Sequence, residues 1–202
     1  MPPSGTATSR TLPGVGPANS LGHTARVHVS TTSVPGLLKI DLDLHLDGRG
    51  WFKEGYQSAK LSAQGFPPFE VVQSNVSFNA EVGVTRGIHA EPWDKYISLA
   101  HGRAFAAIVD LRDGPTFGRV ETVELHPGNA LFVPRGCGNS YQTTTPDVVY
   151  TYLVNAHWSP SAQYTLIQAF DPALGIAWPI GEADAIRSDA DRGHPPLAAL
   201  RR

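Results

Sequence analysis

The sequence has a single cysteine, Cys137, among 202 residues. This excludes an intrachain disulfide and a zinc site built from several cysteines, and it favours a reducing compartment, the cytoplasm. The chain also lacks any run of about 18 consecutive apolar residues, so we expect no membrane-spanning helix. With 16 basic and 18 acidic residues, the formal charge is only -2. We therefore expect no partner among nucleic acids or membrane surfaces.

The first part of the chain lacks the features of a folded segment. Residues 1–25 are rich in Pro, Gly, Ser and Thr and contain no apolar run of the kind that a signal peptide needs. We expect them to form a flexible tail. Residues 26–202 are long enough to bury one core and too short for a second full domain, so we expect a single domain there.

From residue 26 onward the chain consists of short apolar segments separated by glycine and proline. The segment "LLKIDLDLHL", residues 37–46, alternates apolar and polar side chains, which predicts a strand with one buried face. In "RAFAAIVDL", residues 103–111, both alternating sets are mainly apolar, which predicts a strand covered on both faces. The same pattern predicts strands at these segments: 26–32, 37–46, 69–78, 96–100, 103–111, 119–126, 130–134 and 148–154.

Helical segments are few in this sequence. Only residues 51–63 and 181–190 resemble helices, and both are short. The pattern predicts an all-β fold, a double-sheet jelly-roll barrel with a few short helices. An immunoglobulin-like sandwich is the alternative, but the Cys…Trp…Cys spacing of that fold is missing.

A metal site is one use for a barrel interior that contains histidines. The stretch "GNALFVPRGCGN", residues 128–139, has glycines and a proline at spacings that resemble the second signature of the cupins. Asn139 stands where a metal-binding cupin has histidine, and the first half of the barrel offers only His89 and Glu91. Two ligands are fewer than zinc or iron needs, so we expect no functional metal.

The decapeptide "RGIHAEPWDK", residues 86–95, gathers proton-handling and anion-binding groups. Strand alternation places Gly87 and His89 on one face and Arg86 on the other, unless Gly87 carries a bulge. A lone histidine is often only a hydrogen-bonded core or rim residue, and the pair Tyr150 and Tyr152 on one strand face suits packing as well as catalysis.

Several polar side chains elsewhere have both a structural and a functional interpretation. Arg49 follows a turn-forming Asp-Gly, and Gln73 and Asn75 share one face of a strand. These are turn and edge positions, but their side chains are also donors suited to phosphate oxygens or a sugar. No GxGxxG or Walker-type loop is present, so side chains at the barrel mouth would have to hold any nucleotide.

Taken together, these segments resemble the dTDP-4-dehydrorhamnose 3,5-epimerase family of metal-independent, cupin-like nucleotide-sugar epimerases. The resemblance runs from about Asp47 to Leu197. It rests on the order and spacing of seven pieces: "DGRGWFKEGY", "VVQSN", "TRGIHAE", "DKYISLAHGRAFAAIVDLRDGPTFGR", "LFVPRGCGNSY", "YTYLVNAHWSP" and "DPALGIAWP".

The resemblance implies a role for each matching position. His89 falls on the catalytic base, Lys95 on the lysine beside the keto oxygen, and Tyr152 on the general acid. Asp191 falls on the aspartate that orients the base. The nucleotide or its diphosphate would be bound by four positions: Arg49, Gln73, Asn75 and Arg86. Asn139 is a further substrate-binding position, and there the chain departs from the family, because this asparagine replaces a histidine near the sugar. Other departures are Leu153 in place of a lysine, and His157 and Trp158 in place of two tyrosines near the nucleotide base.

The activity that this resemblance implies is epimerisation at C3, at C5 or at both carbons of a dTDP-4-keto-6-deoxyhexose. The neighbouring ketone acidifies both C–H bonds, so a base and an acid on opposite faces of the sugar invert the carbon without any cofactor. A homodimer is also implied. A non-catalytic nucleotide-sugar-binding protein and another sugar enzyme on this scaffold, such as a ketoisomerase, are the alternatives.

Overall fold

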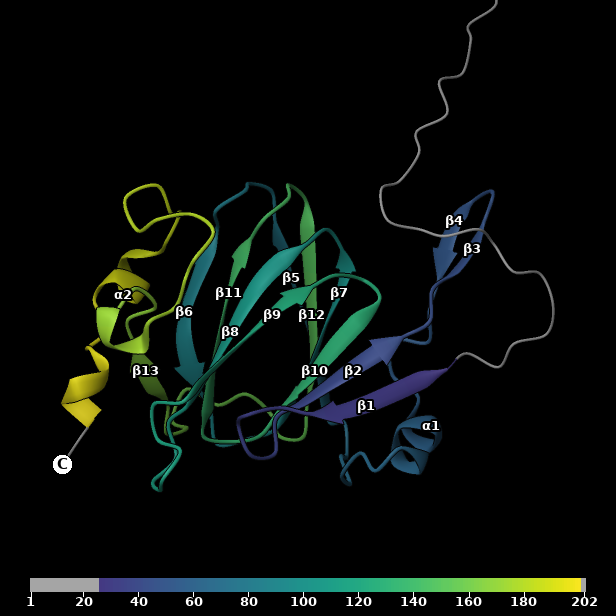
Figure 1. Ribbon diagram of the computed structural model, residues 1–202, viewed down its shortest axis with the longest axis horizontal. Coiled ribbons are helices and arrows are strands. Elements are labelled where there is room, and N and C mark those ends of the chain that lie inside the picture. Colours follow the sequence, from purple (N-terminus) through teal and green to yellow (C-terminus); the bar gives the residue numbers. More distant parts are fainter. Residues whose placement is uncertain (1–25, 201–202) are drawn as a thin grey trace, which may run out of the picture.

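A computed structural model describes residues 26–200 of the chain, so the predicted tail at 1–25 lies outside the described residues. The described part is almost entirely β-structure, with two antiparallel sheets that face each other and form a barrel (Figure 1). This confirms the predicted all-β, double-sheet architecture. Within these residues, no helix has the length and apolar character needed to cross a membrane.

The larger sheet has six strands in the order β1-β2-β10-β7-β12-β5. Its strands are β1 (Val27–Thr31), β2 (Leu38–Leu42), β10 (Asn129–Val133), β7 (Lys95–His101), β12 (Val148–Val154) and β5 (Gln73–Asn79). The smaller sheet has five, in the order β13-β6-β11-β8-β9. They are β13 (Thr165–Ile167), β6 (Thr85–Ala90), β11 (Cys137–Thr143), β8 (Ala104–Asp110) and β9 (Val120–Leu125).

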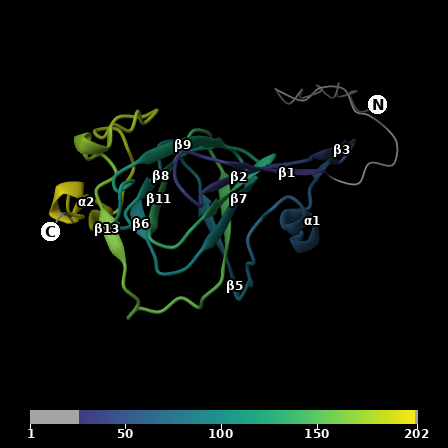
Figure 2. The same cartoon turned by 60° about the horizontal axis from the view of Figure 1, so that its bottom comes forward.

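The core consists of three apolar layers, and the middle layer lies between the two sheets. It includes Ile97 and Leu99 from β7 and Ala106 and Ile108 from β8. A second layer covers the outside of the larger sheet, where Phe66 packs against Phe132 with ring centroids 4.9 Å apart. In the third layer, the C-terminal part of the chain covers the outside of the smaller sheet (Figures 1 and 2). The strand at 103–111 is thus covered on both faces, as its sequence predicts.

The predicted helix at 181–190 is wrong. Residues 181–185 form turns, and the backbone of Ile186 is bonded to Gly83 and Thr85 beside β6, so these groups are not free for a helix. The short α2 (Asp189–Arg192) follows, and Ser188 caps its N-terminus. Two other short helices, η1 (Pro172–Leu174) and η2 (Leu197–Leu200), lie in the same C-terminal region.

The expected helix at 51–63 and the expected strand at 37–46 are each only partly correct. Helix α1 covers Ser58–Ala63, and the Gln57 side chain accepts a hydrogen bond from the Lys60 amide at its start. The strand ends at Leu42, and the next residues form a separate hairpin of β3 (His45–Asp47) and β4 (Gly50–Phe52). This hairpin stands away from the two sheets (Figure 1).

Candidate active site

A cavity of about 190 Å³ opens between the two sheets. Both sheets contribute to its wall, with side chains from β5, β7 and β12 on one side and from β6 and β11 on the other. Five of the nine residues proposed from sequence line it. The lining residues are Ser77, Arg86, Gly87, His89, Glu91, Lys95, Asn139, Tyr141, Tyr150 and Tyr152.

Strand β6 supplies both a histidine and an arginine to this cavity because its alternation is interrupted. Against β11, His89 pairs with Asn139 and Arg86 pairs with Tyr141, so the register shifts between these pairs. The extra residue allows Arg86 and His89, three positions apart, to line the same cavity. The bulge foreseen as an exception to the alternation is therefore present.

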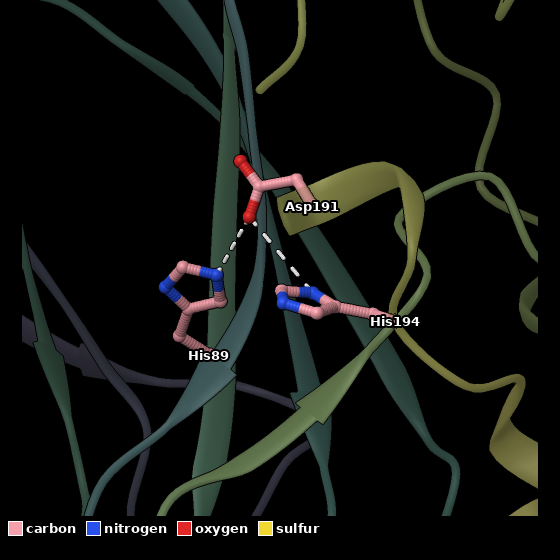
Figure 3. A group of neighbouring side chains, drawn as sticks. All are labelled: His89, Asp191 and His194. Atoms are coloured by element: carbon pink, nitrogen blue, oxygen red, sulfur yellow. Dashed lines mark hydrogen bonds and ion pairs between the residues drawn. The ribbon is translucent and has the colours of Figure 1, made fainter. Parts of the chain in front are cut away.

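His89 is paired with the carboxylate proposed to orient it. Its Nε2 atom lies 2.9 Å from Oδ1 of Asp191, which is carried by α2 (Figure 3). Burial raises the pKa of Asp191, but hydrogen bonds involving His89 and Ser188 outweigh this and bring the pKa to about 2. The aspartate is therefore ionised at neutral pH. An Nε2 that faces a carboxylate carries the proton, which leaves the lone pair on Nδ1, on the side of the ring away from Asp191 (Figure 3).

Gly87 allows this pair to form. A β-carbon at position 87 would lie 2.5 Å from Oδ1 of Asp191 and 3.1 Å from Nδ1 of His194. Both side chains thus rest directly on the backbone of β6. His194, which gave no signal in the sequence, lies with its ring centroid 5.3 Å from that of His89.

Lys95 is the buried cation of the cavity. Its side chain is only 4% exposed, and its Nζ atom contacts the carboxylate of Glu91 and the amide oxygen of Asn139. Burial lowers the pKa of Lys95 to about 7, and the adjacent Glu91 carboxylate works against that shift. Asn139 therefore fixes the position of the ammonium group, a contact that the sequence did not indicate.

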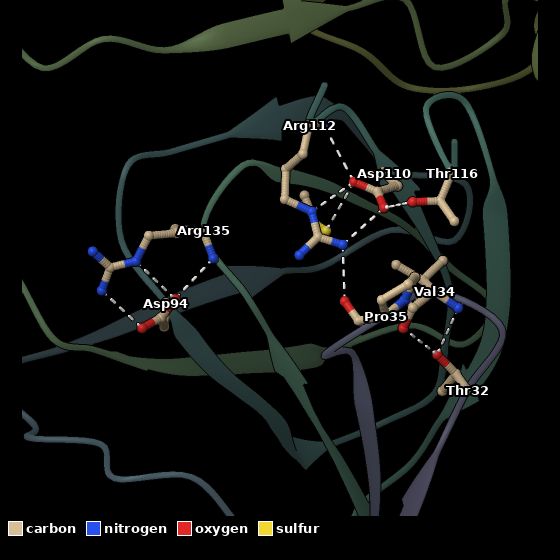
Figure 4. Close-up of polar contacts among 9 residues, drawn as sticks. Thr32, Val34, Pro35, Asp94, Asp110, Arg112, Thr116 and Arg135 are labelled. Carbon is tan, nitrogen blue, oxygen red and sulfur yellow. Dashed lines mark hydrogen bonds and ion pairs between the residues drawn. The ribbon is translucent and has the colours of Figure 1, made fainter. Parts of the chain in front are cut away.

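A cluster around Asp94 holds the start of β7 and so the position of Lys95. The Asp94 carboxylate accepts two hydrogen bonds from the Arg135 guanidinium, at 3.2 and 3.0 Å (Figure 4), and one from the Asn155 amide at 2.8 Å. The loop before Lys95 is thereby fastened to the segments that follow β10 and β12.

Three tyrosines line the cavity, Tyr150 and Tyr152 from β12 of the larger sheet and Tyr141 from β11 of the smaller sheet. Tyr141 and Tyr150 stack with ring centroids 4.1 Å apart, and Tyr152 meets Tyr150 edge-on at 6.1 Å. Burial raises the pKa of Tyr152, so its phenol is protonated at neutral pH. Tyr150 is 3% exposed and serves as a packing residue that also lines the cavity.

The proposed nucleotide-binding residues are arranged unevenly. Arg86 lines the cavity, and its guanidinium contacts Ser77 and Asn79. Gln73 and Asn75 lie outside the lining but on β5, with Asn75 directly beside Tyr152. Their side chains are bonded to each other at 2.7 Å.

Arg49 does not reach the cavity of its own chain. It lies at the tip of the β3–β4 hairpin, its side chain is 91% exposed, and its guanidinium pairs with Asp47 at 2.6 Å. The structure therefore does not bring Arg49 together with the other proposed site residues.

Comparisons with known proteins point to one family. A sequence model of the family described as dTDP-4-dehydrorhamnose 3,5-epimerase matches residues 31–199. A protein RmlC homolog from Streptococcus pyogenes serotype M6 is 45% identical over 83% of this chain and 88% of its own length. A dTDP-4-dehydro-6-deoxyglucose 3-epimerase from Streptomyces bikiniensis is 31% identical over 84% and 89%.

Solved structures give the same result. RmlC from Streptococcus suis, in complex with dTDP-D-xylose, superposes with a TM-score of 0.82 at 40% identity, covering 91% of this chain and 96% of that one. The family match spans most of the described residues, and the relatives share both sequence and fold. This chain belongs to the dTDP-4-dehydrorhamnose 3,5-epimerase family.

Proposed function

We propose that this protein epimerises a dTDP-4-keto-6-deoxyhexose at C3, at C5 or at both carbons. The observation that carries the proposal is the pairing of His89 with Asp191 at the wall of a cavity that also holds Lys95 and Tyr152. Such a pair makes a histidine an effective base, because the carboxylate fixes the tautomer and stabilises the imidazolium that forms. The family described above is that of a 3,5-epimerase, and one of the relatives named there is a 3-epimerase.

The placement of base and acid on different sheets supports inversion. His89 belongs to β6 of the smaller sheet, whereas Tyr152 belongs to β12 of the larger sheet. A sugar ring held between the sheets would present one face to each residue. His89 removes the proton from one face and Tyr152 returns a proton to the other, which inverts the carbon.

Lys95 has the position and environment needed to stabilise the enolate. As an ammonium group beside the C4 oxygen, it would neutralise the charge that develops when the C–H bond breaks. Its burial excludes water, which strengthens this interaction. Loss of such a group typically costs on the order of 10²-fold or more in rate.

The diphosphate is assigned to Arg86, and the nucleotide to the side chains at the end of β5. Arg86 is the arginine of the cavity, and a guanidinium suits phosphate oxygens. Gln73 and Asn75 continue the row that begins with Ser77 on β5 and leads out of the cavity. The relatives bind sugars linked to dTDP, as in the Streptococcus suis complex.

We also propose a homodimer, with Arg49 acting on the partner's site. The outer face of β5 exposes Val76 at 68% and Phe78 at 62%, and the hairpin exposes Phe52 at 64%. Exposed apolar groups on an edge strand suit contact with a second copy. In such a dimer, the projecting β3–β4 hairpin, which does not reach the cavity of its own chain, can place Arg49 at the cavity of the second copy. The single, buried Cys137 is consistent with a reducing, cytoplasmic location.

Proton NMR in heavy water tests the proposed reaction. With dTDP-4-keto-6-deoxyglucose as substrate, the wild type is expected to replace the protons at C3, C5 or both by deuterium. The exchange pattern tells which carbons are deprotonated, and the coupling constants of the product tell which are inverted. His89→Ala is expected to abolish exchange, because no enolate forms. His101→Ala, at an exposed position at the end of β7, is the matched control and should behave as wild type.

Two results would contradict the proposal. Equal exchange in wild type and folded His89→Ala would place the base elsewhere. Binding of dTDP-sugar by the wild type without any exchange or turnover would identify a non-catalytic binding protein instead.

A further inference from the structure

The proposed dyad has a third member that catalysis by His89 and Asp191 does not require. Oδ1 of Asp191 lies 2.9 Å from Nε2 of His89 and 3.8 Å from Nδ1 of His194 (Figure 3). The three donor atoms lie within 4.8 Å of one another. Two imidazoles and one carboxylate therefore converge on one point.

His194 is not satisfied in this arrangement. Its Nδ1 atom is buried and has no hydrogen-bond partner among residues 26–200, and 3.8 Å is too long for a hydrogen bond to Asp191. Burial, and next the neighbouring His89, lower the pKa of His194, which disfavours the doubly protonated, charged form of this ring. The buried Nδ1 atom of a neutral His194 thus faces the ionised carboxylate of Asp191. No cation among the described residues lies between these two groups to balance the negative charge.

We propose that His89, Asp191 and His194 form a binding site for a divalent metal ion of the zinc class, and that a metal bound there inhibits the enzyme. Zinc binds histidine nitrogen at about 2.0–2.1 Å and carboxylate oxygen at about 2.0–2.2 Å, so donors in a tetrahedral site lie roughly 3.3 Å apart. The separations of 2.9 and 3.8 Å fall on either side of this value. Side-chain shifts of about half an ångström bring these two separations to that value, and the two imidazole nitrogens already lie within 4.8 Å of each other.

The donor set selects the metal. Imidazole nitrogen suits zinc, cobalt and nickel, whereas magnesium and calcium prefer oxygen ligands. Three protein ligands leave a fourth position for water. Asp191 and His194 are also held in place beforehand, because both rest on the backbone at Gly87 and belong to one short segment of the chain.

Inhibition follows from the tautomer of His89, and this step rests on the proposed role of His89 as the base. In the active form, Nε2 carries the proton that faces Asp191, and the lone pair on Nδ1 is free to accept one. A metal needs the lone pair of Nε2, so the proton moves from Nε2 to Nδ1 of the same neutral ring. No lone pair remains for the sugar, and proton abstraction stops. The arginine and the β5 side chains proposed for the nucleotide are not involved, so dTDP binding is retained.

The test is a titration of chelator-treated protein with Co²⁺, followed by its visible absorbance, and with Zn²⁺, followed by calorimetry. We expect one site per chain, with the absorbance bands of a tetrahedral centre. His194→Gln should weaken binding by about 10-fold or more, since it removes one of three ligands. His101→Gln is the matched control. In turnover assays, Zn²⁺ should lower kcat of the wild type over the same concentration range, EDTA should restore it, and dTDP affinity should stay constant.

The metal titration tests the site, and the activity assay tests the inhibition. Absence of a saturable site in the wild type, or equal metal affinity in wild type and His194→Gln, would overturn the site. Saturation with zinc at undiminished kcat would overturn the inhibition. If the protein proves to have no epimerase activity, the proposed function fails, but the titration still decides whether the metal site exists. A His194→Gln protein that does not fold is replaced by His194→Asn, and the wild-type titration decides by itself.

Discussion

Gly87→Ala is expected to inactivate the enzyme by adding one methyl group beneath the dyad. The new β-carbon would lie 2.5 Å from Oδ1 of Asp191, whereas an ordinary contact is roughly 3.5 Å. Asp191 must therefore retreat by about 1 Å. Such a movement takes the 2.9 Å bond between Asp191 and His89 out of hydrogen-bond range.

The loss in rate can be estimated from this displacement. A misplacement of about 1 Å in a catalytic arrangement costs on the order of 10²-fold, and loss of the orienting carboxylate from a histidine base up to about 10⁴-fold. We therefore expect kcat to fall by about 10² to 10⁴-fold, with dTDP affinity unchanged. Gly181→Ala is the control, because a β-carbon at that position meets nothing within 4 Å. Initial rates, calorimetric binding of dTDP and circular dichroism provide the comparison.

A double substitution tests whether Gly87→Ala acts through the contact with Asp191. Gly87→Ala and Asp191→Asn act through the same contact, so the double variant should be little slower than the slower single variant. Multiplicative losses would mean that position 87 acts by another route. Wild-type kcat in Gly87→Ala would refute the geometric argument outright.

Four further outcomes are expected. Tyr152→Phe should reduce formation of the inverted product by about 10² to 10⁴-fold, while NMR still detects deuterium exchange at the carbon that His89 deprotonates. If this exchange were lost as well, Tyr152 could not act as the acid alone. Because burial lowers the pKa of Lys95 to about 7, kcat should fall as the pH rises through this value and the ammonium loses its charge. Glu91→Gln should move this decline to lower pH, since the carboxylate that favours the charged form is gone; an unchanged pH profile would exclude Lys95 as the source. Sedimentation should give a particle near twice 21.7 kDa, and Arg49→Ala should raise KM without changing that mass; a monomer would contradict the dimer. Prolonged chelation should leave turnover intact, and a loss that one divalent metal restores would show that the reaction needs metal.

Alternation of apolar and polar residues predicted the strands whose buried side chains are apolar. Residues 103–111 are apolar on both faces, and β8 is buried on both. Strand β11 was missed because its buried side chains are largely polar. Gln142, for example, is fully buried and bonded to Thr85 and Ile180. Its burial depends on partners distant in the sequence, and a local pattern contains no information about them.

The site residues that belong to one short motif could be predicted from the sequence. The residues that the fold brings to the site from distant segments could not. The decapeptide at 86–95 pointed to His89, Lys95 and Arg86, and all three line the cavity. His194 gave no signal, because its proximity to His89 exists only once the C-terminal segment lies against β6. The position of Arg49 likewise depends on the direction in which the hairpin projects, which residue types do not determine.

The partners in the dyad differ in how firmly the fold holds them. His89 lies within a five-stranded sheet, whereas Asp191, 102 residues later, is the only buried side chain of a four-residue helix. A segment with so little buried surface opens locally at a lower free-energy cost than the barrel. Warming or mild denaturant should therefore abolish the activity while both sheets remain folded. In hydrogen exchange, the backbone amides of residues 188–193 should exchange with solvent faster than those of β8. We therefore expect helix α2 to determine the temperature at which activity is lost. Substitutions that stabilise the barrel core would not raise that temperature.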